Sequence, residues 1–162
     1  MYRLLAHPEN IEPLRQEVDA VIREEGWTKA GIDKMYKIDS FLRETQRLDG
    51  LGLRSLHSLS RVKMLTLRFP VPLIRLALRP FTFSNGVTIP AGTLIAVPGS
   101  AVHTDEANFH DPDTFDGFRF AKFRENEGDT TTNRYQTVST SSEHLAFGLG
   151  RNTWYEFLQC GI

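Results

Sequence analysis

The chain has 162 residues, and its composition excludes several classes of protein. Hydrophobic residues make up 40% of it and charged residues 24%, which is typical of a globular chain long enough for one domain and untypical of a disordered one. The formal net charge of −1 gives no electrostatic footprint for nucleic acid. The single cysteine, Cys160, excludes an internal disulfide, and no apolar stretch is long enough to cross a membrane.

The first third of the chain predicts three helices. Apolar residues recur at helical spacing over residues 8–25, and Gly26 suits the end of that helix. A short helix is expected over 28–36 and a stronger one over 38–48, where Asp39 is the predicted N-cap. The residues of the third helix expected to face a core are Ile38, Phe41, Leu42, Thr45 and Leu48.

A charged pair lies inside this third helix, in the run E-T-Q-R. Glu44 and Arg47 are three residues apart and therefore share a face. Taken alone, the pair is compatible with a solvated surface ion pair, which contributes only a few tenths of a kcal/mol. The motif is common by chance in helices, so its meaning depends on the motifs that come later in the chain.

The middle of the chain predicts strands and turns. Residues 81–90 alternate around Asn85-Gly86, which is typical of a hairpin with a two-residue turn. A second turn is expected over 90–93 and a short strand over 94–97, followed by a short helix from Thr104 through Asn108. Residues 121–142 are polar and show no periodicity, which indicates a surface meander.

Near its end the chain contains the run F-G-L-G-R, which comprises Phe147, Gly148, Gly150 and Arg151. Together with E-T-Q-R on a helix and F-D-G-F-R-F at 115–120, it resembles, in this order, the C-terminal part of the cytochrome P-450 family, with a fungal character. The resemblance implies an α+β fragment, the C-terminal part of a mainly α fold. The expected parts of this partial domain, 1–162, are helices in 1–48, strands and turns in 53–98, a short helix, meander and start of the haem loop in 99–151, and a divergent tail in 152–162.

The resemblance also implies roles for particular residues. Glu44 and Arg47 would bond each other and Arg119, forming a structural ion-pair network, although Gly117-Phe118 departs from the Pro-Glu of many relatives. The residues expected on the proximal side of a haem are Phe147, Gly148, Gly150 and Arg151. Either Arg54 or Arg61 would pair with a haem propionate, and two solvated arginines are the alternative.

The parent activity implied by the resemblance is haem-thiolate monooxygenation of a small apolar organic substrate, with electrons from a reductase. The parent would belong to the endoplasmic reticulum membrane, whereas this chain has no membrane segment and would be cytoplasmic if expressed. The family's ligand position holds Trp154, and an indole has only an N–H donor and no lone pair for iron. Cys160 lies six residues later, up to about 20 Å along an extended chain, and is expected to be a free thiol. No catalytic residue is therefore assigned, and activity is expected to be lost.

Two segments have no counterpart in the family. Residues 62–77 intrude between two well-matched segments, which favours translated non-coding sequence, with a genuine apolar insertion as the alternative. Residues 152–162 are interpreted as a tail created by a splice or frame error after Arg151.

The competing function is a non-catalytic truncated fragment or a haem-free interaction module. The histidines lack the spacing of a zinc site; they are His7, His57, His103, His110 and His144.

Overall fold

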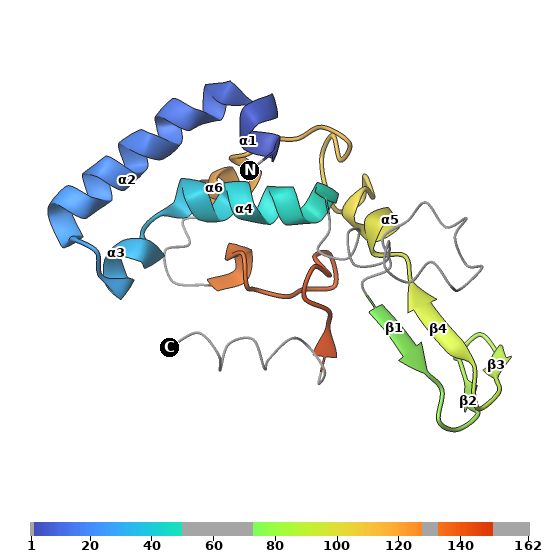
Figure 1. Ribbon diagram of the computed structural model, residues 1–162. Coiled ribbons are helices and arrows are strands. Elements are labelled where there is room, and N and C mark those ends of the chain that lie inside the picture. The colour runs from blue at the N-terminus through green and yellow to red at the C-terminus, as the bar shows by residue number, and fades with distance from the viewer. Residues whose placement is uncertain (1, 50–72, 128–132, 151–162) are drawn as a thin grey trace. The chain divides into compact units, whose positions relative to one another are not determined.

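The computed structural model describes residues 2–49, 73–127 and 133–150 (Figure 1). The chain divides into two compact units. The first comprises Met1–Asp49 and Asp113–Ser139, and the second comprises Gly50–Pro112 and Thr140–Ile162. Helices and small antiparallel sheets make up the described part, so the α+β prediction is confirmed at this level.

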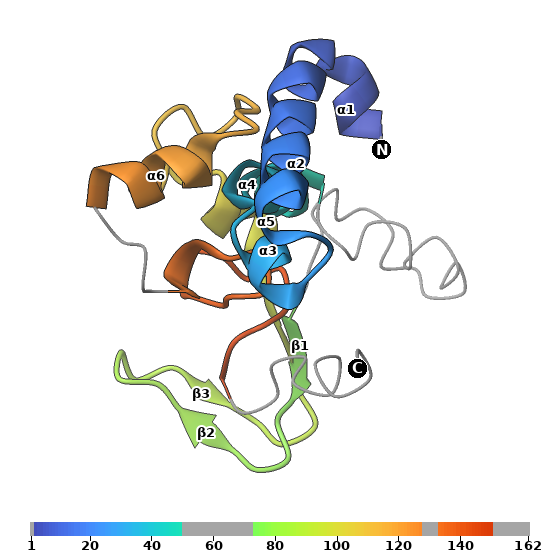
Figure 2. The same cartoon turned by 90° about the vertical axis from the view of Figure 1, so that its left-hand side faces the viewer.

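The first unit begins with α1 (Tyr2–Ala6), a 3₁₀ turn η1 (Pro8–Asn10) and α2 (Ile11–Glu25). The predicted helix over 8–25 is therefore present as a 3₁₀ segment that continues into an α-helix, with α1 at one end of α2 (Figure 2). Gly26 ends it with φ of 66° and donates its N–H to the Ile22 carbonyl at 3.0 Å. A glycine is favoured here because the left-handed region is strained for residues with a Cβ.

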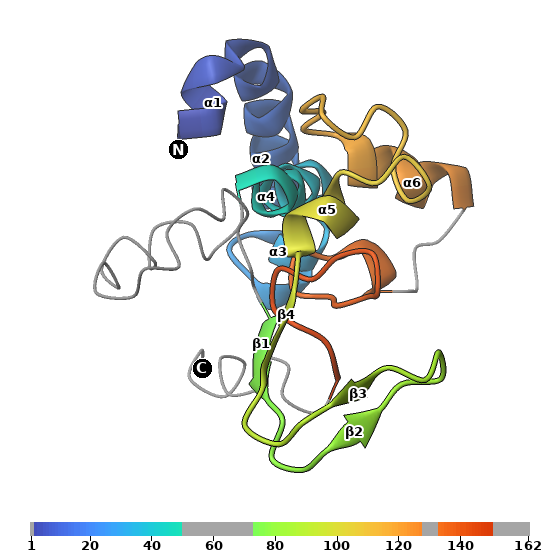
Figure 3. The same cartoon turned by 90° about the vertical axis from the view of Figure 1, so that its right-hand side faces the viewer.

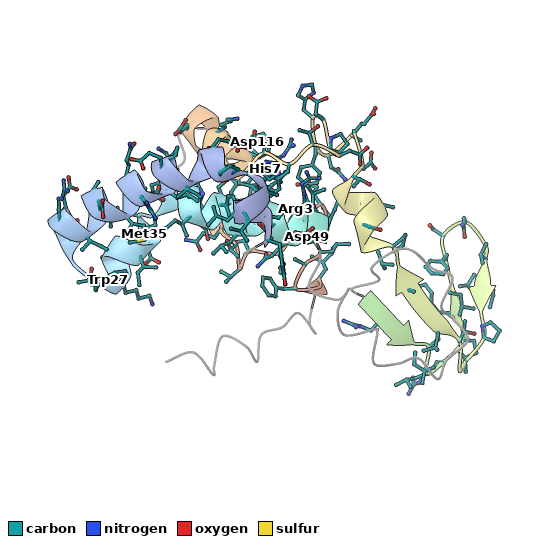
Figure 4. All side chains as sticks on the ribbon, turned by 45° about the horizontal axis from the view of Figure 1, so that its top comes forward. Arg3, His7, Trp27, Met35, Asp49 and Asp116 are labelled. Atoms are coloured by element: carbon teal, nitrogen blue, oxygen red, sulfur yellow. The ribbon has the colours of Figure 1, made fainter. Side chains whose placement is uncertain are left out.

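An arginine near the N-terminus ties α1 to a later helix, α4 (Tyr36–Asp49). Arg3 donates from Nη2 and Nε to the Asp49 carboxylate at 2.8 and 2.9 Å, and Figure 4 shows the two side chains meeting. The hydrogen bond to Asp49 raises the pKa of the Arg3 guanidinium above its ordinary value. Arg3 also lies over the Phe115 ring, at 5.3 Å from its centroid. These contacts connect both ends of this unit's first segment.

Between α2 and α4 in the chain lies α3 (Lys29–Asp33), which begins where Thr28 Oγ1 accepts the Gly31 N–H at 3.1 Å. α4 starts two residues earlier than the predicted helix, and the assignment of Asp39 as its N-cap was wrong. The Asp39 N–H already donates to the Met35 carbonyl, so Asp39 lies inside the first turn. Its carboxylate instead accepts Arg124 Nη2 at 2.7 Å.

The buried face of α4 is polar, which contradicts the predicted apolar face. Ser40, Glu44 and Arg47 have exposed fractions of 0, 0 and 2%, whereas Leu42 is 50% exposed. Of the predicted core-facing set, Phe41 is the one that is buried, and the others are half-buried or exposed. Polar burial costs free energy unless every group is bonded, and here residues 113–139 supply the partners.

A helix that the sequence did not predict packs on α4. α6 (Arg119–Glu127) occupies part of the expected meander over 121–142, and the 3₁₀ turn η3 (Asn133–Tyr135) follows it. Phe120 is 3% exposed, and Arg43 Cζ lies over its ring, 4.9 Å from the ring centroid. The sequence does not predict this helix because few of its residues are apolar and they show no clear helical periodicity. The helix is stabilised by its contacts with α4.

The second unit contains two antiparallel pairs of strands in its described part (Figure 3). β1 (Leu73–Leu76) pairs with β4 (Leu94–Val97) in the register Leu73↔Val97, and β2 (Phe81–Thr82) pairs with β3 (Thr88–Ile89). The turn at 90–93 is confirmed, with Gly92 at φ of 82°. β1 lies in the segment predicted to be an insertion, 62–77, so the end of that segment is part of a sheet. Residues 62–72 lie outside the described residues.

Two local predictions in this unit were wrong. The Gly86 N–H donates to the Phe83 carbonyl and the Phe83 N–H to the Val87 carbonyl, each at 2.9 Å, so the hairpin loop has three residues and not two. Gly86 alone takes positive φ, 86°, which is typical of a turn with a bulge. The short helix is α5 (Gly99–His103), and Thr104 ends it, because its N–H donates to the Ser100 carbonyl at 2.9 Å.

Gly117 offers a test of packing in the first unit. A Cβ at this position would lie 2.8 Å from Phe41 Cδ2 and 3.1 Å from Asn10 Oδ1. Because the Phe41 ring is buried, it cannot move away freely, and Gly117→Ala should lower the free energy of unfolding by about 1–3 kcal/mol. Urea unfolding followed by circular dichroism measures this loss.

The matched control places the same change in a Phe41→Leu background. Leucine removes the ring atom that the new methyl group would meet, so Gly117→Ala should cost less there than in the unmodified chain. An equal cost in both backgrounds would show that the Phe41 ring is not what requires glycine at position 117.

Candidate functional site

The carboxylate of Glu44 accepts several hydrogen bonds from described residues of the first unit. Its Oε1 accepts Arg47 Nη2 at 2.8 Å and Arg119 Nε at 3.2 Å. The same oxygen accepts the Asp116 N–H at 3.1 Å, and Oε2 accepts Arg47 Nε at 2.8 Å. The structure therefore brings Glu44, Arg47 and Arg119 into one cluster, as the resemblance to the family implied for these three residues.

The two arginines also share a backbone acceptor. Arg119 Nη2 donates to the Thr114 carbonyl at 2.9 Å, and Arg47 Nη2 reaches the same oxygen at 3.4 Å. The side chains of Glu44 and Arg47 have no exposed surface, and that of Arg119 is 8% exposed. The surface-pair interpretation of E-T-Q-R is therefore wrong, because all three charged groups are withdrawn from water. Removal of one charge from such a cluster strands the others.

A serine that the sequence patterns did not reveal holds the start of α6. Ser40 Oγ accepts the N–H groups of Phe120 and Ala121, both at 3.1 Å, and donates to the Gly117 carbonyl at 3.0 Å. The first N–H groups of a helix have no partner within that helix. The hydroxyl of Ser40, which belongs to α4, therefore takes the place of an N-cap for α6. Its position fixes where α6 begins and, with that, where Arg119 lies.

Arg43 and Asp39 connect α4 to the end of the same unit. Arg43 Nη1 donates to the carbonyls of Ser139, at 3.0 Å, and of Gln136. Asp39 Oδ1 accepts the Thr137 N–H at 3.0 Å. These partners lie more than 90 residues away in the sequence, so no local pattern could have revealed them. Together they show that α4 organises the described residues of the ranges 113–127 and 133–139.

The F-G-L-G run lies in the second unit, at the end of its described part. The Gly148 N–H donates to the Leu145 carbonyl at 3.0 Å, closing a four-residue turn. Gly148 and Gly150 have φ of 83° and 81°, a region that only glycine adopts without strain. Phe147 is half-buried within this turn. The two glycines are therefore required by the backbone of the loop itself.

Several predicted site residues lie outside the described residues; they are Arg54, Arg61, Arg151, Trp154 and Cys160. The fit of a haem can be judged from the chemistry of the donors. Gly148 and Gly150 carry no Cβ, so a ligand could approach the backbone there closely, but Trp154 supplies no lone pair for iron. The donor set therefore does not fit a haem-thiolate centre. Within the described residues no group of three His, Cys, Asp or Glu side chains could hold a metal ion.

Comparison with known proteins adds an independent observation. A family model described as Cytochrome P450 matches residues 64–153, more than half of the chain. The match begins inside the segment predicted to be an insertion and ends one residue before Trp154.

No helix in the described ranges combines the length and apolarity that crossing a membrane requires.

Three fungal proteins illustrate the relatives of this chain. Cytochrome P450 monooxygenase 103 of Postia placenta is 43% identical over 152 residues, which cover 94% of this chain and 27% of the relative. Cytochrome P450 monooxygenase ltmQ of Epichloe festucae var. lolii is 37% identical, with 94% and 25% covered. Ent-kaurene oxidase P450-4 of Gibberella fujikuroi is 36% identical, with 93% and 27% covered. The chain thus spans about a quarter of the length of these relatives.

Glu44→Gln tests the buried cluster. The amide keeps the shape of the side chain but removes the charge that Arg47 and Arg119 share, so the free energy of unfolding should fall by about 3–5 kcal/mol. Chemical denaturation of the two chains measures the difference.

Glu25→Gln is the control, because Glu25 pairs with Lys34 at the surface and the substitution makes the same chemical change there. Its effect should be much smaller, since solvent screens this pair. Equal effects at the two positions would contradict the assignment of Glu44 as a buried organising group.

Ser40→Ala tests the cap on α6. Loss of the hydroxyl leaves two buried N–H groups and one carbonyl without their partner, which should cost about 1–3 kcal/mol. Hydrogen exchange of the Phe120 and Ala121 amides should become faster, whereas Ser84→Ala in the exposed hairpin loop should leave it unchanged. Unchanged exchange in Ser40→Ala would remove the capping role.

Proposed function

The chain belongs to the cytochrome P450 family, and we propose that it carries the proximal scaffold of a monooxygenase without the sulfur ligand that the family's reaction needs. The family is haem-dependent, and its members insert oxygen into organic substrates. The observation that carries the proposal is Trp154, which follows F-G-L-G-R where the resemblance to the family places the cysteine ligand. An indole nitrogen donates a proton but offers no lone pair.

The scaffold part of the proposal assigns roles to two sets of residues. Glu44, Arg47 and Arg119 hold residues 114–119 against α4, and their mutual bonding and burial support this role. The residues that would lie on the haem side are Phe147, Gly148, Gly150 and Arg151, and the positive φ of both glycines supports this role for the described part of the loop. Either Arg54 or Arg61 would meet a propionate.

The parent activity belongs to the same proposal. Small apolar organic compounds would be the substrates, a reductase would supply the electrons, and the endoplasmic reticulum membrane would be the location of the parent. Since this chain spans about a quarter of the length of its relatives, these properties concern the whole protein. For the 162-residue chain itself we propose a non-catalytic product that retains the organisation of the proximal region.

Haem reconstitution tests this proposal. The purified chain is mixed with haem, reduced and exposed to carbon monoxide, and its absorption spectrum is recorded. The expected result is no thiolate-type band, because neither Trp154 nor the displaced Cys160 places sulfur at the ligand position. A thiolate-type band from the unmodified chain would contradict the proposal.

Two tryptophan variants sharpen the measurement. Trp154→Cys places a thiol at the ligand position, and Trp27→Cys places one at a side chain that is 75% exposed on the other unit. Both carry Cys160→Ser, so that each chain contains one cysteine. A thiolate-type band is expected for Trp154→Cys alone. The same band in both variants would show adventitious ligation, and its absence from both would remove the haem-side role of the loop.

A further inference from the structure

The geometry points to His103 as a positioning residue for the turn at 145–148, which leads into the F-G-L-G run. His103 acts there as a neutral hydrogen-bond acceptor for the backbone N–H of the first residue of the turn. His103 is the last residue of α5, and Leu145 begins the turn that Gly148 closes. This inference concerns the shape of the loop and deepens the proposed function, since it rests on the assignment of that loop to the haem side.

The contact is a single buried hydrogen bond. The Leu145 N–H donates to His103 Nε2 at 2.8 Å. Both residues are 4% exposed, so water cannot replace either partner. Loss of a buried acceptor leaves the amide with the full cost of its desolvation. The bond therefore holds the two segments together although they are 42 residues apart in the chain.

The direction of the bond fixes the state of the imidazole. A ring nitrogen that accepts an N–H carries no proton, so Nε2 is bare and the proton of the neutral ring is on Nδ1. An imidazolium has donors at both nitrogens and could not accept the Leu145 N–H. The position thus demands an acceptor and not merely a side chain of this volume.

The bond is continuous with the turn. Leu145 receives support at its N–H from His103, and its carbonyl accepts the Gly148 N–H at 3.0 Å. One residue earlier, the His144 N–H donates to Ser141 Oγ at 3.1 Å. The backbone on both sides of Leu145 is therefore held, and His103 is the support that comes from a distant segment.

A packing role is the competing explanation, because the rings of His103 and His144 are stacked with their centroids 5.2 Å apart and an angle of 20° between them. Two substitutions separate the alternatives. His103→Gln keeps an acceptor at nearly the reach of Nε2 but loses the ring. His103→Phe keeps a ring for the stack but has no acceptor.

Hydrogen exchange of the Leu145 and Gly148 amides in the full 162-residue chain gives the main readout. His103→Phe should accelerate exchange at Leu145 by about tenfold or more, with a smaller effect at Gly148. His103→Gln should stay within a few-fold of the unmodified chain. Equal acceleration in both variants, or none in His103→Phe, would overturn the inference.

A second measurement needs no substitution and covers the case in which a variant does not fold. The ¹⁵N chemical shifts of the His103 ring in the unmodified chain should identify the Nδ1–H tautomer, with Nε2 accepting a hydrogen bond. A proton on Nε2, or a Leu145 amide without protection, would contradict the inference. Both readouts are independent of haem. Absence of the thiolate-type band from Trp154→Cys would therefore remove the haem-side role of the loop and leave the role of His103 intact.

Discussion

The arrangement of the first unit depends on one desolvated carboxylate. Glu44 has no exposed surface, and two guanidinium groups and a backbone N–H meet at its oxygens. A buried charge is tolerated only when its bonding is complete, so the segment that supplies Arg119 and Asp116 must return to α4 in one register. This requirement explains why a stretch of largely polar sequence forms an ordered helix there.

The sequence predicted where helices, strands and turns occur better than it predicted which side of a helix is buried. The helices over 8–25, 28–36 and 38–48, the turn at 90–93 and the strand over 94–97 are all present, because periodicity, glycine and proline report local structure. The buried stripe of α4 and the existence of α6 were missed. Ser40 and Arg43 find their partners 77 to 96 residues away, and no local pattern carries that information.

The candidate site shows the same division. Glu44, Arg47 and Arg119 were identifiable because their order and spacing match a known family, and the structure brings them together. The roles of Ser40 and His103 were not identifiable, because each acts by accepting backbone N–H groups, and a backbone partner leaves no trace in the sequence. The chemistry of the predicted ligand position could be judged from the sequence alone, since it depends only on the identity of Trp154.

A double-mutant cycle between Glu44→Gln and Arg119→Met tests the central claim most directly. If the carboxylate is what makes the arginine tolerable in the interior, removal of Arg119 should cost at least about 1 kcal/mol less in the Glu44→Gln background than in the unmodified chain. Free energies of unfolding for the four proteins give this coupling. Costs that add to within about 0.5 kcal/mol would contradict the account.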